Sequence, residues 1–357
     1  MKILILKPSS LGDVIHALPV LRLLKRRFPA GDIYWWIDAD LASLLADDPD
    51  LTGIVPFFRH RWASPFHWHE AIASIRHIRA MSFDWVIDLQ ALLRSGVLAW
   101  LSGGRLRIGL EDGREGAPAF YDRLVPRPSA ATHAVDWYLE TLRLLDVPTN
   151  GPFEWLPPRP AVADAVRRRW HLGREPWILL HPGARWLNKR WPEAAYATVI
   201  RRLAQTLPEA RFAVLGGTSE RKLGAALCAT LPGRCLDLTG ATSLPEMVEW
   251  IRHGTLLITN DSGPLHVAAA LRRPVVAIFG PTDPRRTGPY GQVDQVLRVN
   301  LPCAPCLKSA CANARPLQCL HDIPPEAVVA AVTARWPAFR DPPARNWSLP
   351  AGVAALD

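Results

Sequence analysis

Short apolar runs alternate along this chain with longer segments in which apolar residues recur every three or four positions. The residues between Lys2 and Lys7 are all apolar, as expected of a parallel strand buried on both faces. Between positions 14 and 24, apolar residues then recur with a helical period. Strands are expected in the same way at 33–37, 86–89, 177–181, 211–215, near 236, 256–259 and 274–279, and helices at 41–46, 132–146, 193–206, 220–230, 244–251 and 325–335. This alternation predicts an α/β protein with doubly wound parallel sheets.

A proline-rich stretch from Pro148 to Pro160 interrupts the pattern and separates two similar halves. We therefore expect an N-terminal Rossmann-like domain at 1–150, a linker at 151–160, a C-terminal Rossmann-like domain at 161–336 and a loose tail at 337–357. Doubly wound domains bind ligands at the carboxyl edges of their sheets. Residues that carry chemistry should therefore come directly after strands.

The clearest polar turn follows the apolar strand at 256–259. There Asn260, Asp261, Ser262 and Gly263 lead into a helix rich in small residues. The unpaired N–H groups of a helix start, together with the positive end of its dipole, form a natural anion site. Asn260, Asp261 and Ser262 are also all preferred N-cap residues, so capping without any chemistry explains the turn equally well.

Three more residues beyond strand ends have suitable chemistry. Asp13 lies in the first turn of the first helix, where it can act as a general base or complete a capping box with Ser10. Lys189 lies in a loop beyond a strand and can meet a phosphate, although a loop lysine is usually solvated. Glu220 can bind ribose hydroxyls, although acids are common in first helical turns for dipole reasons.

Basic and aromatic residues interleave in two short stretches, Arg59-His60-Arg61-Trp62 and Phe66-His67-Trp68-His69. Arg76 and Arg79 follow on a short amphipathic helix. Such a segment fits an anionic amphiphile or a membrane surface. It also fits stacking on nucleic acid, or a loop that is simply solvated.

Four cysteines fall within one proline-rich loop: Cys303, Cys306, Cys311 and Cys319. Four thiolates can hold structural zinc or iron, but zinc sites usually combine two tight C-x-x-C pairs, and only one pair is tight here. A structural metal and reduced thiols that pack the loop are both compatible with the spacing.

Composition narrows the class of partner. The 357 residues carry a formal net charge of +9 with a pI near 9.6, which favours an anionic partner. No apolar run approaches the roughly 20 residues of a membrane-spanning helix, and the apolar start is too short for a signal peptide, so we expect a cytoplasmic protein with reduced cysteines. Neither Gly-x-Gly-x-x-Gly after the first strand nor Gly-x-x-x-x-Gly-Lys-Ser/Thr occurs, which argues against dinucleotide-binding and P-loop proteins.

A series of motifs resembles, in order, those of glycosyltransferase family 9, the ADP-heptose:lipopolysaccharide heptosyltransferases. The resemblance extends from residue 1 to about 330. The motifs are Lys7-Pro8-Ser9-Ser10-Leu11-Gly12-Asp13-Val14-Ile15-His16-Ala17-Leu18-Pro19, Asp88-Leu89-Gln90 with Arg94-Ser95, Lys189 with Trp191-Pro192-Glu193, Asp261-Ser262-Gly263-Pro264-Leu265-His266 and Gly280-Pro281-Thr282-Asp283-Pro284.

This resemblance implies a GT-B fold, in which two Rossmann-like domains face each other across a cleft. It also implies an inverting transfer of heptose from ADP-heptose, without a catalytic metal, with Asp13 as the base. Glu220 would bind the ribose and Asp261 the sugar of the donor. The residues that would hold the donor diphosphate are Lys189, Ser262, Gly263 and His266.

On the acceptor side, the resemblance assigns Arg59, Arg61 and Arg114 to an anionic, lipid-linked saccharide of the lipopolysaccharide core, either Kdo–lipid A or a heptosyl acceptor. It further implies a peripheral enzyme on the inner face of the inner membrane, with no nucleic acid partner. Two other functions stay open: a catalytically silent nucleotide- or anion-binding GT-B protein, and another GT-B enzyme such as a nucleotide-sugar epimerase.

Overall fold

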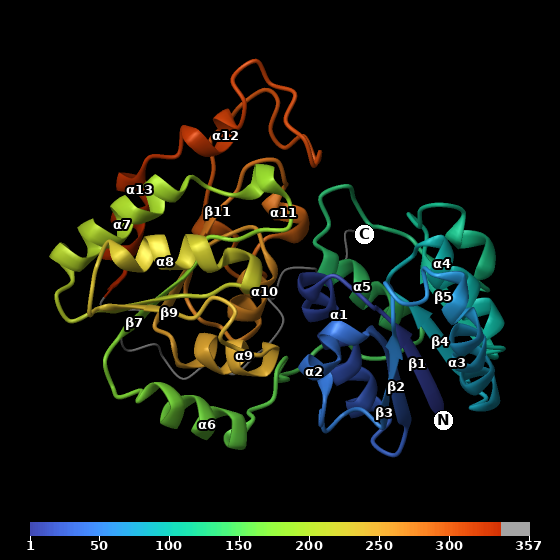
Figure 1. Ribbon diagram of the computed structural model, residues 1–357. Coiled ribbons are helices and arrows are strands. Elements are labelled where there is room, and N and C mark those ends of the chain that lie inside the picture. Colours follow the sequence, from blue (N-terminus) through green and yellow to red (C-terminus); the bar gives the residue numbers. More distant parts are fainter. Residues whose placement is uncertain (337–357) are drawn as a thin grey trace. The chain divides into compact units, whose positions relative to one another are not determined.

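The computed structural model describes residues 1–336, so the tail expected at 337–357 lies outside the described residues. The described chain forms two compact units that divide between Pro157 and Pro158. Each unit is built on its own parallel β-sheet, which is covered by helices (Figure 1).

In unit 1 (residues 1–157) the sheet has the strand order β3-β2-β1-β4-β5-β6, and all neighbouring pairs are parallel. Its strands are β1 (Lys2–Leu6), β2 (Asp32–Asp38), β3 (Gly53–Phe57), β4 (Trp85–Asp88), β5 (Leu106–Leu110) and β6 (Arg123–Val125). Its helices are α1 (Leu11–Arg27), α2 (Ala42–Leu45), α3 (Trp68–Ala80), α4 (Leu93–Leu101) and α5 (Ala134–Leu144), with 3-10 turns η1 (Ala39–Leu41), η2 (Pro65–His67) and η3 (Ala117–Phe120). The strand order reverses between β1 and β4, the position at which such sheets bind ligands.

Unit 2 repeats this topology in the order β12-β11-β10-β7-β8-β9, again with parallel pairs. Its strands are β7 (Trp177–His181), β8 (Arg211–Val214), β9 (Cys235–Asp237), β10 (Leu256–Asn260), β11 (Val275–Ile278) and β12 (Val296–Leu297). Its helices are α6 (Pro160–Trp170), α7 (Glu193–Thr206), α8 (Arg221–Ala229), α9 (Leu244–His253), α10 (Gly263–Ala270), α11 (Pro284–Thr287), α12 (Gln318–His321) and α13 (Pro325–Thr333), with 3-10 turns η4 (Leu187–Lys189), η5 (Thr218–Glu220) and η6 (Val293–Gln295). Here the order reverses between β7 and β10.

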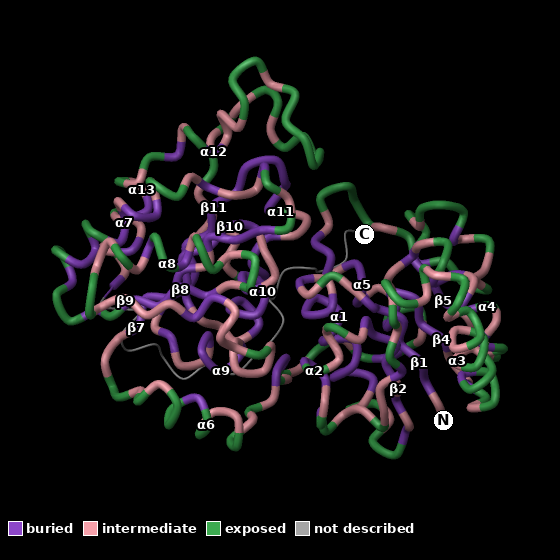
Figure 2. The backbone as a smooth tube through the Cα atoms, in the orientation of Figure 1, coloured by how far each residue is buried: buried purple, intermediate pink, exposed green. Residues whose placement is uncertain are grey.

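The central strands are apolar because helices cover both of their faces. All residues of β10 and β11 are buried, as is β1 after its first residue. In Figure 2 the buried stretches follow the strands, whereas the outer helices and loops are largely exposed.

Every strand expected from the hydrophobic pattern is present, but four strands were not expected. The strands β3 and β5 contain proline, arginine or glycine and are only partly buried, and β6 and β12 are three and two residues long. Such strands lack the continuous apolar run that marks a strand with two covered faces. Helix α6 was also not expected, because it begins at Pro160, in the proline-rich stretch.

Residues 151–157 pack on unit 1. Trp155 is buried, and its carbonyl oxygen accepts a hydrogen bond of 3.0 Å from the Arg22 guanidinium. The same guanidinium pairs with Asp48 at 2.5 Å and with Asp50 at 2.8 Å. Helix α1 is thereby joined to two loops of its unit. Among residues 1–336, no helix combines the length and the apolar character needed to span a membrane.

Candidate active site

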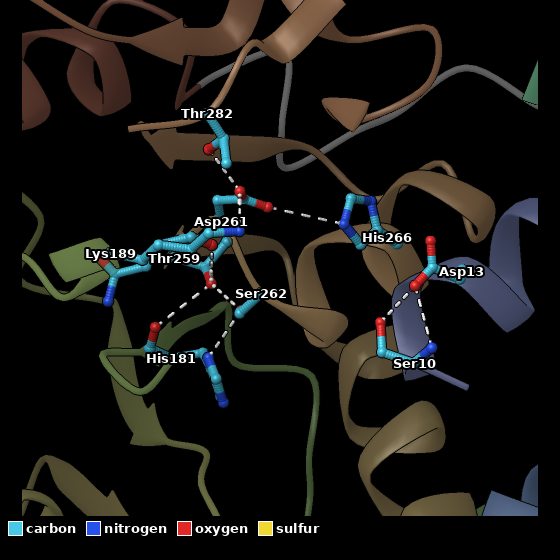
Figure 3. A network of polar contacts seen from close by, with 10 residues as sticks. Ser10, Asp13, His181, Lys189, Thr259, Asp261, Ser262, His266 and Thr282 are labelled. Atoms are coloured by element: carbon cyan, nitrogen blue, oxygen red, sulfur yellow. Dashed lines mark hydrogen bonds and ion pairs between the residues drawn. The ribbon is translucent and has the colours of Figure 1, made fainter. Parts of the chain in front are cut away.

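Asp261, the first residue after β10, is the centre of a polar cluster in unit 2 (Figure 3). Its Oδ2 accepts hydrogen bonds from Lys189 Nζ and from Thr282 Oγ1, each at 2.6 Å. Lys189 follows β7 and Thr282 follows β11, and these two strands flank β10 in the sheet. The parallel sheet therefore brings three distant segments of sequence to one carboxyl edge.

The ammonium group of Lys189 is held firmly at this edge. Its Nζ also lies 4.8 Å from the centroid of the Trp186 ring. The Lys189 side chain is 19 % exposed and that of Asp261 7 %, so water screens the ion pair only weakly. The pair fixes the position of the Lys189 ammonium group, which carries three N–H donors.

Ser262 is the N-cap residue of α10, and its side chain makes no capping hydrogen bond to the first turn. Its Oγ lies instead 3.0 Å from His181 Nδ1 and 3.1 Å from Thr259 Oγ1 (Figure 3). Further along α10, His266 places Nε2 3.9 Å from Oδ1 of Asp261. The Ser262 side chain thus does not cap the first turn of α10. The backbone N–H groups of that turn and the positive end of the helix dipole suit an anion.

Helix capping by Asn260 or Asp261, which the sequence indicated, is wrong. Asn260 is fully buried, and its Oδ1 accepts from the Trp191 backbone N–H and the Tyr196 hydroxyl, each at 3.1 Å. Its Nδ2 donates to the Pro182 carbonyl at 2.7 Å. Asn260 therefore fixes the loop after β7 and the beginning of α7, while Asp261 binds its partners in the polar cluster.

His181, the last residue of β7, is neutral at physiological pH. Burial lowers the pKa of His181 to about 4, and the Arg190 guanidinium acts in the same direction, whereas the Glu220 carboxylate opposes the shift. The neutral ring orients the Ser262 hydroxyl without adding charge to the anion site.

Glu220 ends the 3-10 turn η5 and accepts a hydrogen bond of 2.8 Å from the Gly217 N–H. It lies 3.5 Å from Arg190 Nη2. A Cβ atom at Gly183 would come within 3.2 Å of the Glu220 side chain, so the absence of a side chain lets the loop after β7 approach this carboxylate. The Glu220 carboxylate is therefore a fixed hydrogen-bond acceptor at the same carboxyl edge of the sheet as Lys189.

In unit 1, Asp13 lies in the first turn of α1 (Figure 3). Its Oδ2 accepts hydrogen bonds from the Ser10 N–H at 3.0 Å and from the Ser10 hydroxyl at 2.7 Å. The acidic half of the predicted capping box is therefore formed.

Lys7, directly after β1, is a buried cation near that carboxylate. Its Nζ donates to the Leu89 carbonyl at 2.8 Å and lies 4.9 Å from the centroid of the Tyr138 ring. Burial acts to lower the pKa of Lys7, but the Tyr138 oxygen and the carboxylates of Asp13 and Asp88 outweigh it, so that the pKa is raised. Lys7 therefore keeps its charge at neutral pH.

Two arginines meet at the carboxyl edge of unit 1. Arg59 bonds to the Ser9 hydroxyl, and its Nε lies 3.5 Å from Asp38. Arg94, on α4, lies over the Phe57 ring at 5.8 Å, and its pKa is lowered, first by burial and then by the charge of Arg59. An anion bound here would relieve the repulsion between the two guanidinium groups.

Arg61 and Arg114 are both exposed but differ in surroundings. Arg61 pairs with Glu70, and its Nε donates to His67 Nδ1 at 3.3 Å, so its side chain lies along the start of α3. The backbone N–H of Arg114 donates to the Ala91 carbonyl at 3.0 Å, which ties its loop to the segment after β4. Arg59 and Arg61 thus come from one loop of unit 1, between β3 and η2, and Arg114 comes from another, between β5 and η3.

Large apolar side chains are exposed on η2 and α3. Phe66 is 86 % exposed, Trp68 57 % and Ile72 48 %. Trp68, Ile72 and the exposed Arg76 follow at intervals of four residues, so they share one face of α3. We call Phe66, Trp68, Ile72 and Arg76 the aromatic face. Exposed aromatic rings beside arginines are typical of surfaces that meet membranes.

The four cysteines of the proline-rich loop line one cavity of about 290 Å³. The Leu317 N–H lies 3.4 Å from Cys311 Sγ, and backbone hydrogen bonds lower the pKa of this exposed thiol. Burial raises the pKa of Cys319. Within residues 1–336, no group of three or more His, Cys, Asp or Glu side chains is placed to hold a metal ion. The thiols share a cavity but are not arranged there as ligands of one ion.

Sequence reasoning gave no role to Thr282, His181 or Arg94. Thr282 and Arg94 stand within family motifs and His181 ends a strand, so position was the signal that could have identified them. Their partners, however, are contributed by other strands and helices. A strand-end position is therefore a useful signal, but the contact that gives it meaning depends on strand order.

Comparison with known proteins identifies the family of this chain. The sequence model of glycosyltransferase family 9 (heptosyltransferase) matches residues 72–316. Lipopolysaccharide heptosyltransferase 1 of Pseudomonas aeruginosa is 32 % identical over 324 residues, which cover 87 % of each chain.

Solved structures show the same architecture. The ADP-heptose lipopolysaccharide heptosyltransferase II of E. coli has a TM-score of 0.74 at 26 % identity and covers 94 % of this chain and 98 % of its own. An E. coli heptosyltransferase solved with ADP has a TM-score of 0.74 at 24 % identity, with 94 % and 99 % covered, and it shares the fold. The chain therefore has the GT-B fold and belongs to glycosyltransferase family 9, the heptosyltransferase family.

Proposed function

We propose that this enzyme transfers a heptose from ADP-heptose to the inner core of lipopolysaccharide, onto Kdo–lipid A or a heptosyl residue, with inversion and without a catalytic metal. The observation that carries the proposal is the anion site of unit 2. There the Lys189–Asp261 pair lies beside the N-terminus of α10, whose first turn has no side-chain cap. The names of the similar proteins, which specify ADP-heptose and lipopolysaccharide, support the choice of substrates.

In this proposal the donor diphosphate binds at the start of α10. Lys189 supplies the cation, the Ser262 hydroxyl and the Gly263 N–H supply hydrogen bonds, and His266 lies on the next turn of the helix. As the bond to the sugar breaks, negative charge grows on the departing diphosphate. A lysine and a helix dipole that are already in place stabilise this charge with little reorganisation, which is the task a divalent ion performs in other enzymes.

Two carboxylates of unit 2 make the remaining contacts with the ADP-heptose donor. Asp261, held by Lys189 and Thr282, accepts hydrogen bonds from heptose hydroxyls. Glu220, fixed by Gly217, accepts from the ribose hydroxyls. Carboxylates are strong acceptors of hydroxyl hydrogen bonds, so both side chains suit a polyol partner.

Asp13 takes the proton of the attacking hydroxyl. The acceptor oxygen attacks the anomeric carbon from the face opposite to the diphosphate, the bond from carbon to diphosphate oxygen breaks, and the hydroxyl proton passes to Asp13. Ser10 fixes the position of this carboxylate, and Lys7 supplies a positive charge near it. One displacement of this kind inverts the configuration at the anomeric carbon.

The acceptor is anionic, and the arginines of unit 1 match its charge. Arg59 and Arg94 form the paired guanidinium site at the carboxyl edge; Arg61 extends it along the loop that carries Arg59, and Arg114 extends it from the loop after β5. Guanidinium groups bind carboxylates and phosphates through two parallel hydrogen bonds. The aromatic face supports a peripheral position at an anionic membrane, where the lipid part of the acceptor is held.

The central test separates catalysis from helix capping. Replacing Asp13 with Asn removes the base but keeps an acceptor for the Ser10 hydrogen bonds, whereas Ser10→Ala removes a capping bond but keeps the base. We expect Asp13→Asn to lower kcat about 100-fold or more with ADP affinity unchanged, and Ser10→Ala to lower it only a few-fold. Equal and small losses in both variants would mean that Asp13 only caps the helix.

A donor comparison tests the reaction class. We expect release of nucleotide from ADP-heptose, but not from UDP- or GDP-sugars, and only when acceptor lipid is present. Release without acceptor, with an altered sugar as product, would instead indicate an epimerase. ADP binding without turnover on any lipopolysaccharide acceptor would indicate a silent binding protein.

A further inference from the structure

Two thiols of unit 2, outside the proposed donor site, are in contact with each other. Cys228 lies on the last turn of α8, and Cys235 is the first residue of β9. Both are free thiols, and their Sγ atoms are 2.8 Å apart. A disulfide bond is roughly 2.05 Å long, so the two sulfurs need to approach by less than about 1 Å to form one.

The short connection between the two cysteines is held by its own backbone. The Leu231 N–H donates to the Cys228 carbonyl at 3.1 Å, and the Cys235 N–H donates to the Leu231 carbonyl at 3.2 Å. Gly233 has a φ of +77°, a conformation that glycine adopts without strain. Hydrogen bonds and a tight turn therefore fix both ends of this connection.

Arg234, the residue before Cys235, fixes the start of β9. Its guanidinium group donates hydrogen bonds of 3.1, 3.1 and 2.8 Å to the carbonyl oxygens of Ala204, Leu207 and Ala210, respectively. Cys235 itself pairs with a residue of the neighbouring strand β8. The backbone of Cys235 is therefore held by the end of α7 and by the sheet, while α8 holds Cys228. Both sulfurs start from fixed positions, which keeps the entropy cost of joining them low.

The cysteine contact continues a close contact between α8 and β9. A Cβ atom at Gly224 would come within 2.5 Å of Asp237 Oδ1, so the helix and the strand nearly touch there. Gly224 and Cys228 are four residues apart and share one face of α8. Asp237 and Cys235 are two residues apart and share one face of β9. Since β9 is the last strand in its sheet, a covalent link at the cysteines would fasten an edge strand to its helix.

A small reagent can reach these sulfurs. Both cysteines are partly exposed, and Pro232 and Gly233 in the connection between them are exposed. The Cys228 thiol raises the pKa of Cys235, and burial and the Asp237 carboxylate act in the same direction. The Cys235 sulfur therefore keeps its proton at neutral pH, which leaves Cys228 as the sulfur that attacks first.

Core packing explains only part of this arrangement. Both cysteines pack against the hydrophobic core of unit 2, and a free cysteine often serves as a small apolar side chain. Packing accounts for their partial burial, but it does not require the two sulfurs to meet. Contact between two thiols from a helix and a strand is instead the arrangement from which a disulfide forms.

We propose that Cys228 and Cys235 exchange with a small-molecule disulfide to form a reversible disulfide that links α8 to β9 and stabilises unit 2. The Cys228 thiolate attacks one sulfur of a reagent such as oxidised glutathione, and the other glutathione leaves with the electron pair of the broken S–S bond. The Cys235 sulfur then attacks Cys228 Sγ and releases the second glutathione. The two protein thiols are oxidised, and their protons end on two molecules of reduced glutathione. The site needs no assumption about the transferred sugar.

Peptide mapping of the full chain tests the proposal. The folded protein is treated with oxidised glutathione, its remaining thiols are alkylated, and it is digested with trypsin without reductant. Cleavage after Arg234 separates the two cysteines, into peptides 223–234 and 235–252. We expect these two peptides to be joined, with a mass two hydrogen atoms below their sum, and to separate when dithiothreitol is added.

Thermal melting of oxidised and reduced protein tests the stabilisation. We expect oxidation to raise the Tm of the wild type by roughly 5 °C, because the link restricts the unfolded chain. Cys228→Ser is the matched control, since it removes the pair but keeps the four thiols of the proline-rich loop. The proposal is overturned if both peptides stay unlinked, or if either cysteine is joined to a loop cysteine instead. An equal rise in Tm for Cys228→Ser also overturns it.

Discussion

The carboxylate of Asp261 binds Lys189 and Thr282 through the same oxygen, and these partners lie 72 and 21 positions away in the chain. Sequence position marked Asp261 and Lys189 as separate candidates because each lies beyond a strand end. The Thr282 hydroxyl, by contrast, resembled ordinary turn chemistry. Their contact depends on β7, β10 and β11 being neighbours in the sheet, which a hydrophobic pattern does not reveal.

At the same scale, His181 makes stability depend on pH. The unfolded side chain takes up a proton near pH 6.5, but the folded one does so only near pH 4. The stability contributed by the neutral ring is therefore complete above pH 6.5 and is lost as the pH falls toward 4. We expect His181→Asn to remove roughly 2 kcal/mol of the difference in unfolding free energy between pH 7 and pH 5.

Urea unfolding of wild type and variant at both pH values measures this difference. His171→Gln is the matched control, since His171 is exposed in the same unit. If His181→Asn keeps the full pH dependence of the wild type, then burial of the His181 ring is not the cause.

At the scale of elements, β10 links the polar cluster at Asp261 to α7 and to the loop after β7. It ends in Asn260, which bonds to backbone or side chain of Trp191, Tyr196 and Pro182, and it is followed by Asp261, which carries the polar cluster. One strand end therefore fixes α7 and the loop after β7 while placing the next residue, Asp261, between Lys189 and Thr282. In the sequence, Asn260 and Asp261 are both residue types that favour the N-cap position. In the folded chain their side chains bind other partners instead.

Asn260→Leu should consequently be strongly destabilising. The change keeps the volume but leaves the Trp191 N–H, the Tyr196 hydroxyl and the Pro182 carbonyl buried without their partner. We expect a loss of about 2–4 kcal/mol in unfolding free energy. Asn188→Leu is the matched control, because Asn188 is also buried but donates one hydrogen bond, to the Lys308 carbonyl, and should cost about 1 kcal/mol. Equal losses in the two variants would contradict this account of Asn260.

Central and outer strands of the sheets differ in how well they are predicted. Strands β1, β10 and β11 are buried on both faces and appear in the sequence as continuous apolar runs. Strands β3 and β5 are partly exposed, so some of their residues can be polar without being buried. Their positions are decided by pairing with β2 and β4, a tertiary contact with little local signature.

At the scale of the whole molecule, the net charge of +9 and the aromatic face support binding to an anionic membrane. In the proposed membrane complex, charge draws the protein to the surface, and the exposed rings of Phe66 and Trp68 then enter the interface. This expectation rests on the proposed lipid-linked acceptor. It is separable from catalysis because neither ring belongs to the site of transfer.

Flotation with lipid vesicles tests the membrane prediction. We expect binding to vesicles that contain anionic lipid, weakened by high salt, and a loss of about tenfold or more when Phe66 and Trp68 are both replaced by serine. Leu144→Ser is the matched control, since Leu144 is an exposed apolar residue of α5 in the same unit. A double variant that binds vesicles as the control does would exclude the aromatic face as the membrane contact.

The sequence by itself determined the α/β class, the two-part organisation and the positions of Asp13, Lys189 and Asp261 beyond strand ends. It did so because burial of central strands and the opening of helices at strand ends impose local patterns on the residues involved. Only the tertiary structure decided that Lys189 and Thr282 share one oxygen of Asp261 and that Asn260 is structural. These contacts join segments far apart in the chain, and the order of strands in the sheet, rather than any local pattern, brings them together.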